Sequence, residues 1–245
     1  MNKVNVVAVS YSNTIPFLYG IRSDQELMSK INLSLEYPSR CSELLISGQA
    51  DIGLIPVAEI PNVPKSQIIG SYCIGSEKKI KSVMLYSDCP LHEINSIALD
   101  YQSRTSVMLT KVLANNFWKI DVEYLDTTEG YVNSIIGNSA GVVIGDRSYD
   151  LNGTFQYEYD LAEQWFKYTG LPFVFACWVA NKPLNDSFKK QFCLALGYGV
   201  LHKELAIDGL EEKYKNYINN EISYVFDANK QLAMDKFLFL SKKIS

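Results

Sequence analysis

The chain has 245 residues, of which 47% are hydrophobic and 20% are charged, so it is long enough to bury one large core or two smaller ones. Its formal net charge of -4 gives no general attraction for phosphate backbones, and no Lys/Arg-rich run occurs, so we expect no nucleic acid partner. No apolar run approaches the roughly 20 residues that span a bilayer, so we expect no membrane insertion.

The scattered cysteines of the chain contain no CxxC pair, and this pattern favours a reducing compartment over a disulfide framework. The first residues lead directly into a strand-like run without the apolar stretch of a secretion signal, so we expect a cytoplasmic protein. His92 and His202 lack metal-ligand spacing, and neither GxGxxG nor a P-loop occurs. We therefore expect no metal and no cofactor, and the oligomeric state stays open.

Short apolar and β-branched runs predict strands, at residues 4–9, 33–37, 51–56, 82–86, 97–99, 122–125, 141–145 and 173–179. Helix-like stretches lie between several of them and predict parallel α/β units, at residues 39–47, 103–116, 130–138 and 161–168. After Pro183 the periodicity predicts helices packed on the sheet without a strand among them, at residues 187–205, 210–219 and 227–240. Gly197-Tyr198-Gly199 falls inside the first of these helices, where we interpret it as a packing feature.

Two strand-like runs are expected to cross between two lobes, residues 80–87 and 171–180. On this interpretation residues 1–86 and 178–245 form a discontinuous lobe I, and residues 87–177 form lobe II. The expected fold class is therefore α/β with two lobes and a ligand cleft between them, because domain interfaces commonly hold small-molecule pockets. One continuous sheet without a hinge is the alternative.

The stretch from Ser10 to Phe17 places small hydrogen-bonding side chains directly after the first predicted strand, and Thr14-Ile15-Pro16 predicts the start of a helix. In open α/β sheets, ligands bind at the carboxyl ends of strands beside helix N-termini, whose free N–H groups favour anions. We therefore expect Ser10, Asn13 and Thr14 to contact a small anionic metabolite.

A second set of hydroxyls follows the strand at 97–99. Ser103 is the natural N-cap of the next helix. Thr105 and Ser106 either hold a carboxylate at the positive end of the helix dipole or are simple capping residues, and the residues alone leave both interpretations open.

Three further positions are weaker candidates. Gly145 lets backbone approach a ligand and Asp146 accepts hydroxyl hydrogen bonds, although a turn capped by Asp146 is the simpler alternative. Val57 follows the strand at 51–56 and is expected in the wall of the cleft. Ser82 and Ser87 fall on opposite sides of their strand, so one of the two is expected to face the cleft.

Seven motifs, in order along residues 10–178, together resemble those of the chorismate dehydratases, the first enzymes of the futalosine route to menaquinone. They are Ser-Tyr-x-Asn-Thr-x-Pro (10–16), Asp-Ile-Gly-Leu-Ile-Pro-Val-Ala-Glu (51–59), Cys-Ile-Gly-Ser (73–76), Lys-Ser-Val-Met-Leu-Tyr-Ser (81–87), Leu-Asp-x-x-Ser-Arg-Thr-Ser (99–106), Ile-Gly-Asp (144–146) and Thr-Gly-Leu-Pro-Phe-Val-Phe-Ala-x-Trp (169–178). Ser12 departs from the family, which often has an apolar residue there.

The resemblance implies a type II periplasmic-binding-protein fold that has become an enzyme, converting chorismate to 3-[(1-carboxyvinyl)oxy]benzoate and water. It implies that Asn13 and Ser82 are the catalytic polar residues. It also implies that Thr105 and Ser106 hold a carboxylate, and that Gly145-Asp146 lines the opposite lobe.

No His, Glu or Lys presents itself as a general base, so the substrate's own side-chain carboxylate is the expected proton acceptor. Two other functions remain open. The same fold suits a binding protein that carries a small anionic solute without catalysis, and it suits the related 1,4-dihydroxy-6-naphthoate synthase of the same pathway.

Overall fold

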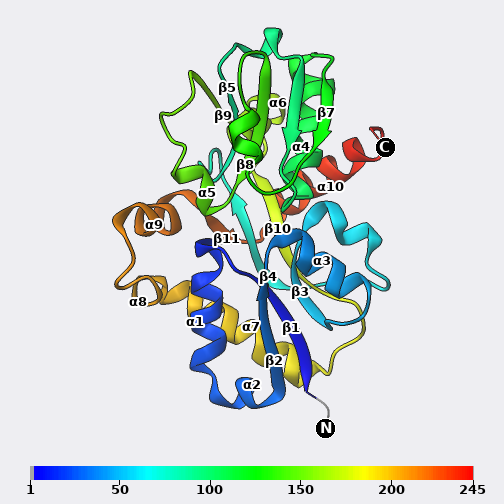
Figure 1. The fold of residues 1–245 in the computed structure, drawn as a ribbon. Helices are drawn as coiled ribbons and strands as arrows, with labels where there is room; N and C mark the ends of the chain where they lie inside the picture. The colour runs from blue at the N-terminus through cyan, green and yellow to red at the C-terminus, as the bar shows by residue number, and fades with distance from the viewer. Residues whose placement is uncertain (1–2, 245) are drawn as a thin grey trace. The chain divides into compact units, whose positions relative to one another are not determined.

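The computed structural model describes residues 3–244, which divide into two compact units (Figure 1). Unit 1 contains the described residues up to Gly75 together with Val174–Asp227, and unit 2 contains Ser76–Phe173 together with the described residues from Ala228 onward. Residues 76–86, 174–177 and 228–244 therefore belong to a different unit from the one expected for them. The reason is pairing and packing: β5 (Val83–Ser87) pairs with strands of unit 2, and Phe237 packs against Trp165 and Phe173.

Unit 1 is built on a six-stranded mixed sheet with the strand order β11-β4-β10-β3-β1-β2. Its strands are β1 (Val4–Val9), β2 (Ile31–Glu36), β3 (Ile52–Pro56), β4 (Gln67–Ser76), β10 (Phe173–Ala180) and β11 (Ser223–Val225). The β1–β2 and β1–β3 pairs are parallel, whereas the β3–β10 and β4–β11 pairs are antiparallel. Strand β1 lies between β3 and the edge strand β2 and is parallel to both, so the carboxyl ends of these three strands point the same way.

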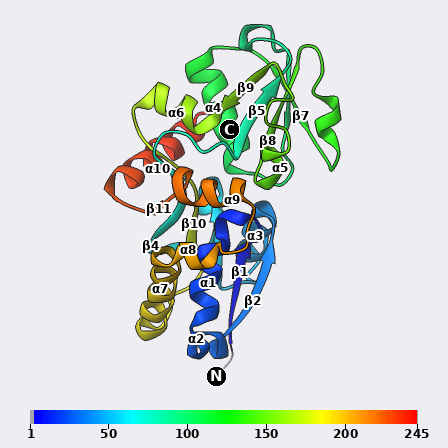
Figure 2. The same cartoon turned by 90° about the vertical axis from the view of Figure 1, so that its left-hand side faces the viewer.

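The helices of unit 1 are α1 (Ile15–Ser23), α2 (Gln25–Lys30), α3 (Pro38–Ile46), α7 (Asp186–Leu201), α8 (Lys203–Ala206) and α9 (Glu212–Asn216). Helices α1 and α7 lie side by side (Figures 1 and 2). Their backbones approach so closely that a Cβ atom on Gly20 would lie 1.9 Å from the Ala195 carbonyl oxygen, and one on Gly199 would lie 1.9 Å from that of Pro16. This confirms that Gly199 serves packing.

Unit 2 has a five-stranded sheet with the order β7-β6-β8-β5-β9. Its strands besides β5 are β6 (Ser96–Leu99), β7 (Glu123–Asp126), β8 (Ser139–Ile144) and β9 (Tyr157–Asp160), and its helices are α4 (Thr105–Leu113), α5 (Asp146–Tyr149), α6 (Leu161–Thr169) and α10 (Ala228–Ser241). Strand β6 is parallel to β7 and β8, and β5 is antiparallel to β8 and β9. Helices α4 and α6 pack together in this unit (Figure 2).

The expectation of parallel α/β units is only partly right, because both sheets are mixed. The expected helix at 130–138 is wrong: only a short 3-10 helix forms there, at Tyr131–Ser134. The expected absence of a strand after Pro183 is also wrong, because β11 adds to the edge of the first sheet. A strand of three residues is too short to show a period of its own, and its pairing with β4 decides its conformation.

Candidate functional site

The residues expected at the site fall into two groups, one in each unit. Unit 1 contains Ser10, Asn13, Thr14 and Val57, and unit 2 contains Ser82, Ser103, Thr105, Ser106, Gly145 and Asp146. In unit 1, Ser10 is exposed at the end of β1, whereas Val57 is fully buried at the start of a 3-10 helix after β3.

Asn13 is the best-anchored residue of the unit 1 group. It lies in a 3-10 helix, Ser12–Thr14, between β1 and α1, and 8% of it is exposed. The Thr14 hydroxyl donates a hydrogen bond to Asn13 Oδ1 (3.1 Å), and Asn13 Nδ2 donates one to the Tyr217 hydroxyl (3.3 Å). These two bonds fix the orientation of the carboxamide and leave its second N–H without a partner among residues 3–244.

The C-terminal part of unit 1 supplies the partners of Asn13, which the sequence analysis missed. Tyr217 opens a π-helical turn, Tyr217–Glu221, and Tyr224 lies in β11. The Tyr224 hydroxyl donates to the backbone carbonyl of Asn13 (2.9 Å), and burial raises the pKa of this phenol well above its ordinary value. Both tyrosines are buried, so they hold Asn13 from the protein interior.

In unit 2, hydrogen bonds bring the expected residues of different strands together. The backbone N–H of Gly145 donates to the carbonyl of Ser82 (2.8 Å), which joins the end of β8 to the residue before β5. Gly145 has φ 69° and ψ -151°, a conformation that is essentially restricted to glycine. The backbone therefore turns sharply here, and Ser82 and Asp146 are placed in neighbouring segments.

Two hydroxyls at the start of α4, those of Ser103 and Ser106, differ in their hydrogen bonding. Helix α4 begins at Thr105 with Arg104 at its N-cap position, so the expected N-cap, Ser103, lies one residue too early. Ser103 Oγ still accepts a hydrogen bond from the backbone N–H of Ser106 (3.0 Å), the kind of bond that a capping side chain makes. Thr105 and Ser106 begin the helix and are 2% and 3% exposed. The Ser106 hydroxyl has no hydrogen-bond partner within the described part of the chain, so capping does not account for this side chain.

A buried carboxylate that sequence analysis did not single out lies beneath these segments. Asp100 is 1% exposed and accepts hydrogen bonds from the backbone N–H groups of Gln102 (2.9 Å) and Ile144 (3.0 Å). Arg147 pairs with it, with a shortest N–O distance of 2.7 Å. The sequence did offer one indication of Asp100, because this residue directly follows β6 and belongs to the motif that also contains Ser103.

A second buried carboxylate supports the turn before Ser82. Lys81 has φ 57°, which costs of order 1–3 kcal/mol for a non-glycine residue. Asp160 Oδ2 accepts from the N–H groups of Ile80 and Lys81 (2.7 Å each), and its Oδ1 caps α6. Burial raises the pKa of Asp160, and its backbone hydrogen bonds oppose that shift. The strained turn thus lies directly beside an expected catalytic residue.

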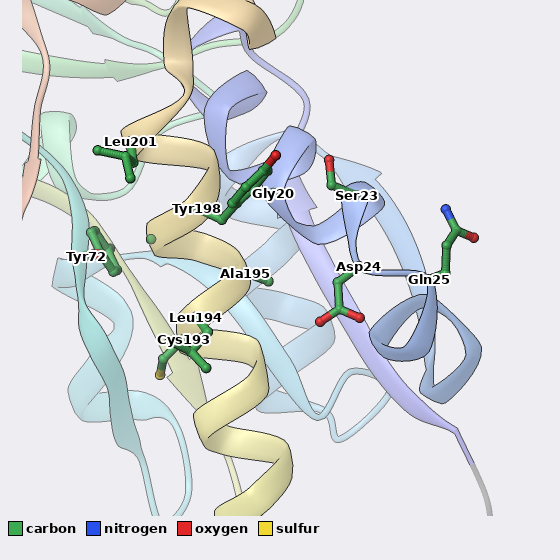
Figure 3. A pocket seen from close by; sticks show the side chains of 11 residues that line it. Gly20, Ser23, Asp24, Gln25, Tyr72, Cys193, Leu194, Ala195, Tyr198 and Leu201 are labelled. Atoms are coloured by element: carbon green, nitrogen blue, oxygen red, sulfur yellow. The ribbon is translucent and has the colours of Figure 1, made fainter.

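Unit 1 also has a cavity of about 1030 Å³ beside α7 (Figure 3). Its lining includes Asp24 and Tyr72, together with several apolar residues of α7, and includes none of the expected site residues. The Asp24 carboxylate already accepts from the N–H of Leu27 (2.9 Å) and from Gln191 Nε2 (3.0 and 3.1 Å). A negatively charged, apolar-walled cavity is a poor site for an anionic metabolite.

Among residues 3–244, no three His, Cys, Asp or Glu side chains gather as they would around a metal ion. In the same range, no helix has both the length and the apolar character needed to cross a bilayer.

A sequence profile described as menaquinone biosynthesis matches residues 4–243. Among solved structures, protein AF1704 from Archaeoglobus fulgidus has a TM-score of 0.80 at 14% identity, with 98% of this chain and 97% of that chain covered. The Candida albicans CA3427 product, described as having the generic periplasmic binding protein fold, has a TM-score of 0.64 at 12% identity, covering 100% and 89%. The periplasmic aliphatic sulphonate binding protein SsuA from Escherichia coli has a TM-score of 0.61 at 15% identity, with 99% of this chain and 92% of that chain covered. These likenesses establish the two-lobe periplasmic-binding-protein-like fold.

Proposed function

The chain belongs to the menaquinone biosynthesis family, and from this premise we propose that it is a chorismate dehydratase, which converts chorismate to 3-[(1-carboxyvinyl)oxy]benzoate and water. The observation that carries the proposal is the family match over residues 4–243, together with the motifs of residues 10–16, 81–87 and 99–106. A biosynthetic role favours the cytoplasm as the place of the reaction.

The chemistry requires little beyond placed hydrogen-bond donors. The hydrogen on C3 of chorismate is allylic and vinylogous to the ring carboxylate, so its removal spreads negative charge into that carboxylate. Loss of the C4 hydroxyl then gives an aromatic ring, which supplies the driving force. The protein must fix the substrate conformation and stabilise the developing charge.

We assign that stabilisation to Thr105 and Ser106. The Ser106 hydroxyl is uncommitted among the described residues, and both residues open a nine-residue helix whose N-terminus favours an anion. The dienolate formed from chorismate is such an anion, because its negative charge lies on the ring carboxylate.

Asn13 and Ser82 are the proposed catalytic residues. The Asn13 carboxamide is held with its N–H groups as donors, and one of them remains available for the ring hydroxyl or the enolpyruvyl group. Ser82 is 2% exposed and follows a strained turn that two hydrogen bonds to Asp160 hold in place. Ser10, Thr14, Val57, Ser103, Gly145 and Asp146 complete the proposed substrate-binding set.

The proton on C3 is proposed to pass to the substrate's own side-chain carboxylate. This assignment predicts a strong primary isotope effect with chorismate deuterated at C3. The effect should persist when each carboxylate of the proposed site, Asp146 among them, is replaced by its amide, and loss of turnover in one such variant would reject the assignment.

The decisive experiment is to mix the purified protein with chorismate and follow formation of a benzenoid product by absorbance and mass spectrometry. A dehydratase releases one water and the meta-substituted benzoate. Tight binding of unchanged chorismate would indicate a solute-binding protein, as SsuA is for aliphatic sulphonates. Inactivity on chorismate with turnover of the sister enzyme's substrate would indicate the 1,4-dihydroxy-6-naphthoate synthase.

A further inference from the structure

One buried carboxylate in unit 2 contacts both of the loops that contain the proposed substrate-binding residues. The side chain of Asp100 is 0% exposed. Its Oδ1 accepts from the N–H of Gln102 (2.9 Å), and its Oδ2 accepts from the N–H of Ile144 (3.0 Å). Gln102 immediately precedes Ser103, and Ile144 immediately precedes Gly145, so one rigid group connects the two loops.

Arg147 completes the arrangement from the second loop. Its Nη2 lies 2.9 Å from Asp100 Oδ1 and 2.7 Å from Oδ2, so it bridges both carboxylate oxygens. The guanidinium carbon also lies 5.5 Å from the centre of the Tyr101 ring. Tyr101 packs against the core of unit 2, so the ion pair contacts a side chain that is itself held in place. The core cluster consists of Met84, Tyr86, Ala98, Tyr131, Ile135 and Val143.

Every group that contacts the Asp100 carboxylate in these bonds is a donor. An amide at this position would turn its NH2 group toward a backbone N–H and the guanidinium, whichever way it was oriented. The arrangement therefore requires the acceptor atoms of a carboxylate, and an amide of the same shape does not satisfy it.

We propose that Asp100 and Arg147 are positioning residues, whose ion pair holds the Ser103–Ser106 loop and the Gly145-Asp146 loop at the spacing that chorismate requires. This inference rests on the proposed function. Neither residue touches the substrate; they act through the backbone of the two loops. The ion pair thereby fixes the distance between two groups of residues that bind the same substrate molecule. One group binds the ring carboxylate, and the other follows β8.

The first test compares steady-state kinetics of Arg147→Gln and Arg147→Lys with the unmodified protein. Arg147→Gln removes the cation and should lower kcat/KM about 100-fold, the loss that a misplacement of about 1 Å produces. Arg147→Lys keeps a cation, and one ammonium can lie between the two oxygens as Nη2 does, so its kcat/KM should be at least about tenfold higher than that of Arg147→Gln. Asp100→Asn is a secondary variant, because it also places a donor among buried donors.

A matched control is available in unit 1. Lys182 pairs with Asp51 at 2.5 Å, and Asp51 likewise accepts a backbone N–H, that of Asn5 (2.9 Å). This pair lies at the amino ends of β1 and β3, whereas Ser10 follows the carboxyl end of β1. Lys182→Gln should leave kcat/KM within about twofold of the unmodified protein, since it contacts none of the proposed loops.

The second test measures amide hydrogen exchange by mass spectrometry and needs no substrate. In Arg147→Gln, exchange should rise in peptides covering 99–106 and 141–149 and remain unchanged in β5 and α6. A rise in only one of the two loops, a rise throughout unit 2, or a kcat/KM within about twofold of the unmodified value would overturn the proposal.

The two tests also separate this inference from the function on which it rests. If the unmodified protein leaves chorismate unchanged, the dehydratase assignment is wrong. The exchange measurement would then still support or overturn the coupling of the two loops by Asp100 and Arg147.

Discussion

Asn13 in unit 1 and Ser82 in unit 2 are both held by networks of hydrogen bonds, but the networks differ in kind. Neutral side chains hold Asn13, and two of them, Tyr217 and Tyr224, come from positions 204 and 211 residues away in the chain. Backbone bonds hold Ser82 and its surroundings, and they are anchored on the carboxylates of Asp100 and Asp160.

The two kinds of network should respond differently to substitution. A neutral hydrogen bond contributes about 1 kcal/mol net, and removal of one partner is tolerated where the other partner finds a new one. A buried carboxylate that several N–H groups contact cannot be removed without leaving those donors unsatisfied. Substitutions in the unit 1 network should therefore cost little stability and should lower kcat only where they free the Asn13 carboxamide, whereas replacement of the unit 2 carboxylates should cost more stability.

The largest effect is expected from Asn13→Ala and Ser82→Ala, each of which removes a proposed catalytic group. Loss of one placed hydrogen-bond donor lowers kcat by roughly 100- to 1000-fold, and we expect this from each variant in steady-state assays with chorismate. Ser87→Ala is the matched control, because Ser87 is equally buried in the strand after Ser82 but is bonded to the Cys89 carbonyl (2.9 Å). Wild-type turnover in Asn13→Ala or Ser82→Ala would remove that residue from the mechanism.

Asp160→Asn should produce the next largest effect, on stability and on its pH dependence. The amide turns a donor toward backbone N–H groups, so we expect a loss of about 1–3 kcal/mol in the free energy of unfolding at neutral pH. The folded-state pKa of Asp160 is raised above its ordinary value because the group is buried.

The sign of the pH effect follows from that shift. Between the unfolded pKa and the raised folded pKa, the native state binds more protons than the unfolded state, so the contribution of Asp160 to stability falls as pH rises through this window. The stability difference between the unmodified protein and Asp160→Asn should therefore shrink as pH rises from about 4, the ordinary pKa of an Asp side chain. Urea unfolding of both proteins at several pH values measures this difference, and a difference that stays constant with pH would contradict the raised pKa of Asp160.

Tyr217→Phe should have a smaller effect, which is confined to catalysis. The substitution removes the acceptor of the Asn13 Nδ2–H group and frees the carboxamide to rotate. We expect kcat to fall about tenfold, equivalent to about 1.4 kcal/mol, while the thermal midpoint changes little. A fall in the midpoint without a fall in kcat would show that Tyr217 is structural only.

Tyr224→Phe should have the smallest effect, and mainly on stability. Its hydroxyl donates to the backbone of Asn13 and does not contact the carboxamide, so the orientation of the catalytic group is retained. We expect a loss of about 1 kcal/mol in the free energy of unfolding, measured by urea titration, with kcat within about twofold of the unmodified value. A larger fall in kcat than in Tyr217→Phe would reverse our ranking of the two tyrosines.

Local patterns in the sequence determined much of this protein. The run at 4–9 is a strand with the expected bounds, Pro16 lies at the start of a helix, and Ser103 Oγ accepts a backbone N–H in the first turn of α4. These features depend on β-branched side chains, on proline's fixed φ and on a hydroxyl within reach of a nearby N–H, which are all properties of a few adjacent residues. The ordered motifs also identified the family correctly.

The partners that hold these residues come from distant parts of the chain and follow from its packing. Nothing near Asn13 in the sequence indicates Tyr217, and nothing near Asp100 indicates that its partner is Arg147, 47 residues later. The same applies to β11, a three-residue strand that exists because β4 offers it an edge. Propensity acts over a few residues, whereas a hydrogen bond between distant segments forms only where the packing of the whole unit brings donor and acceptor within about 3 Å.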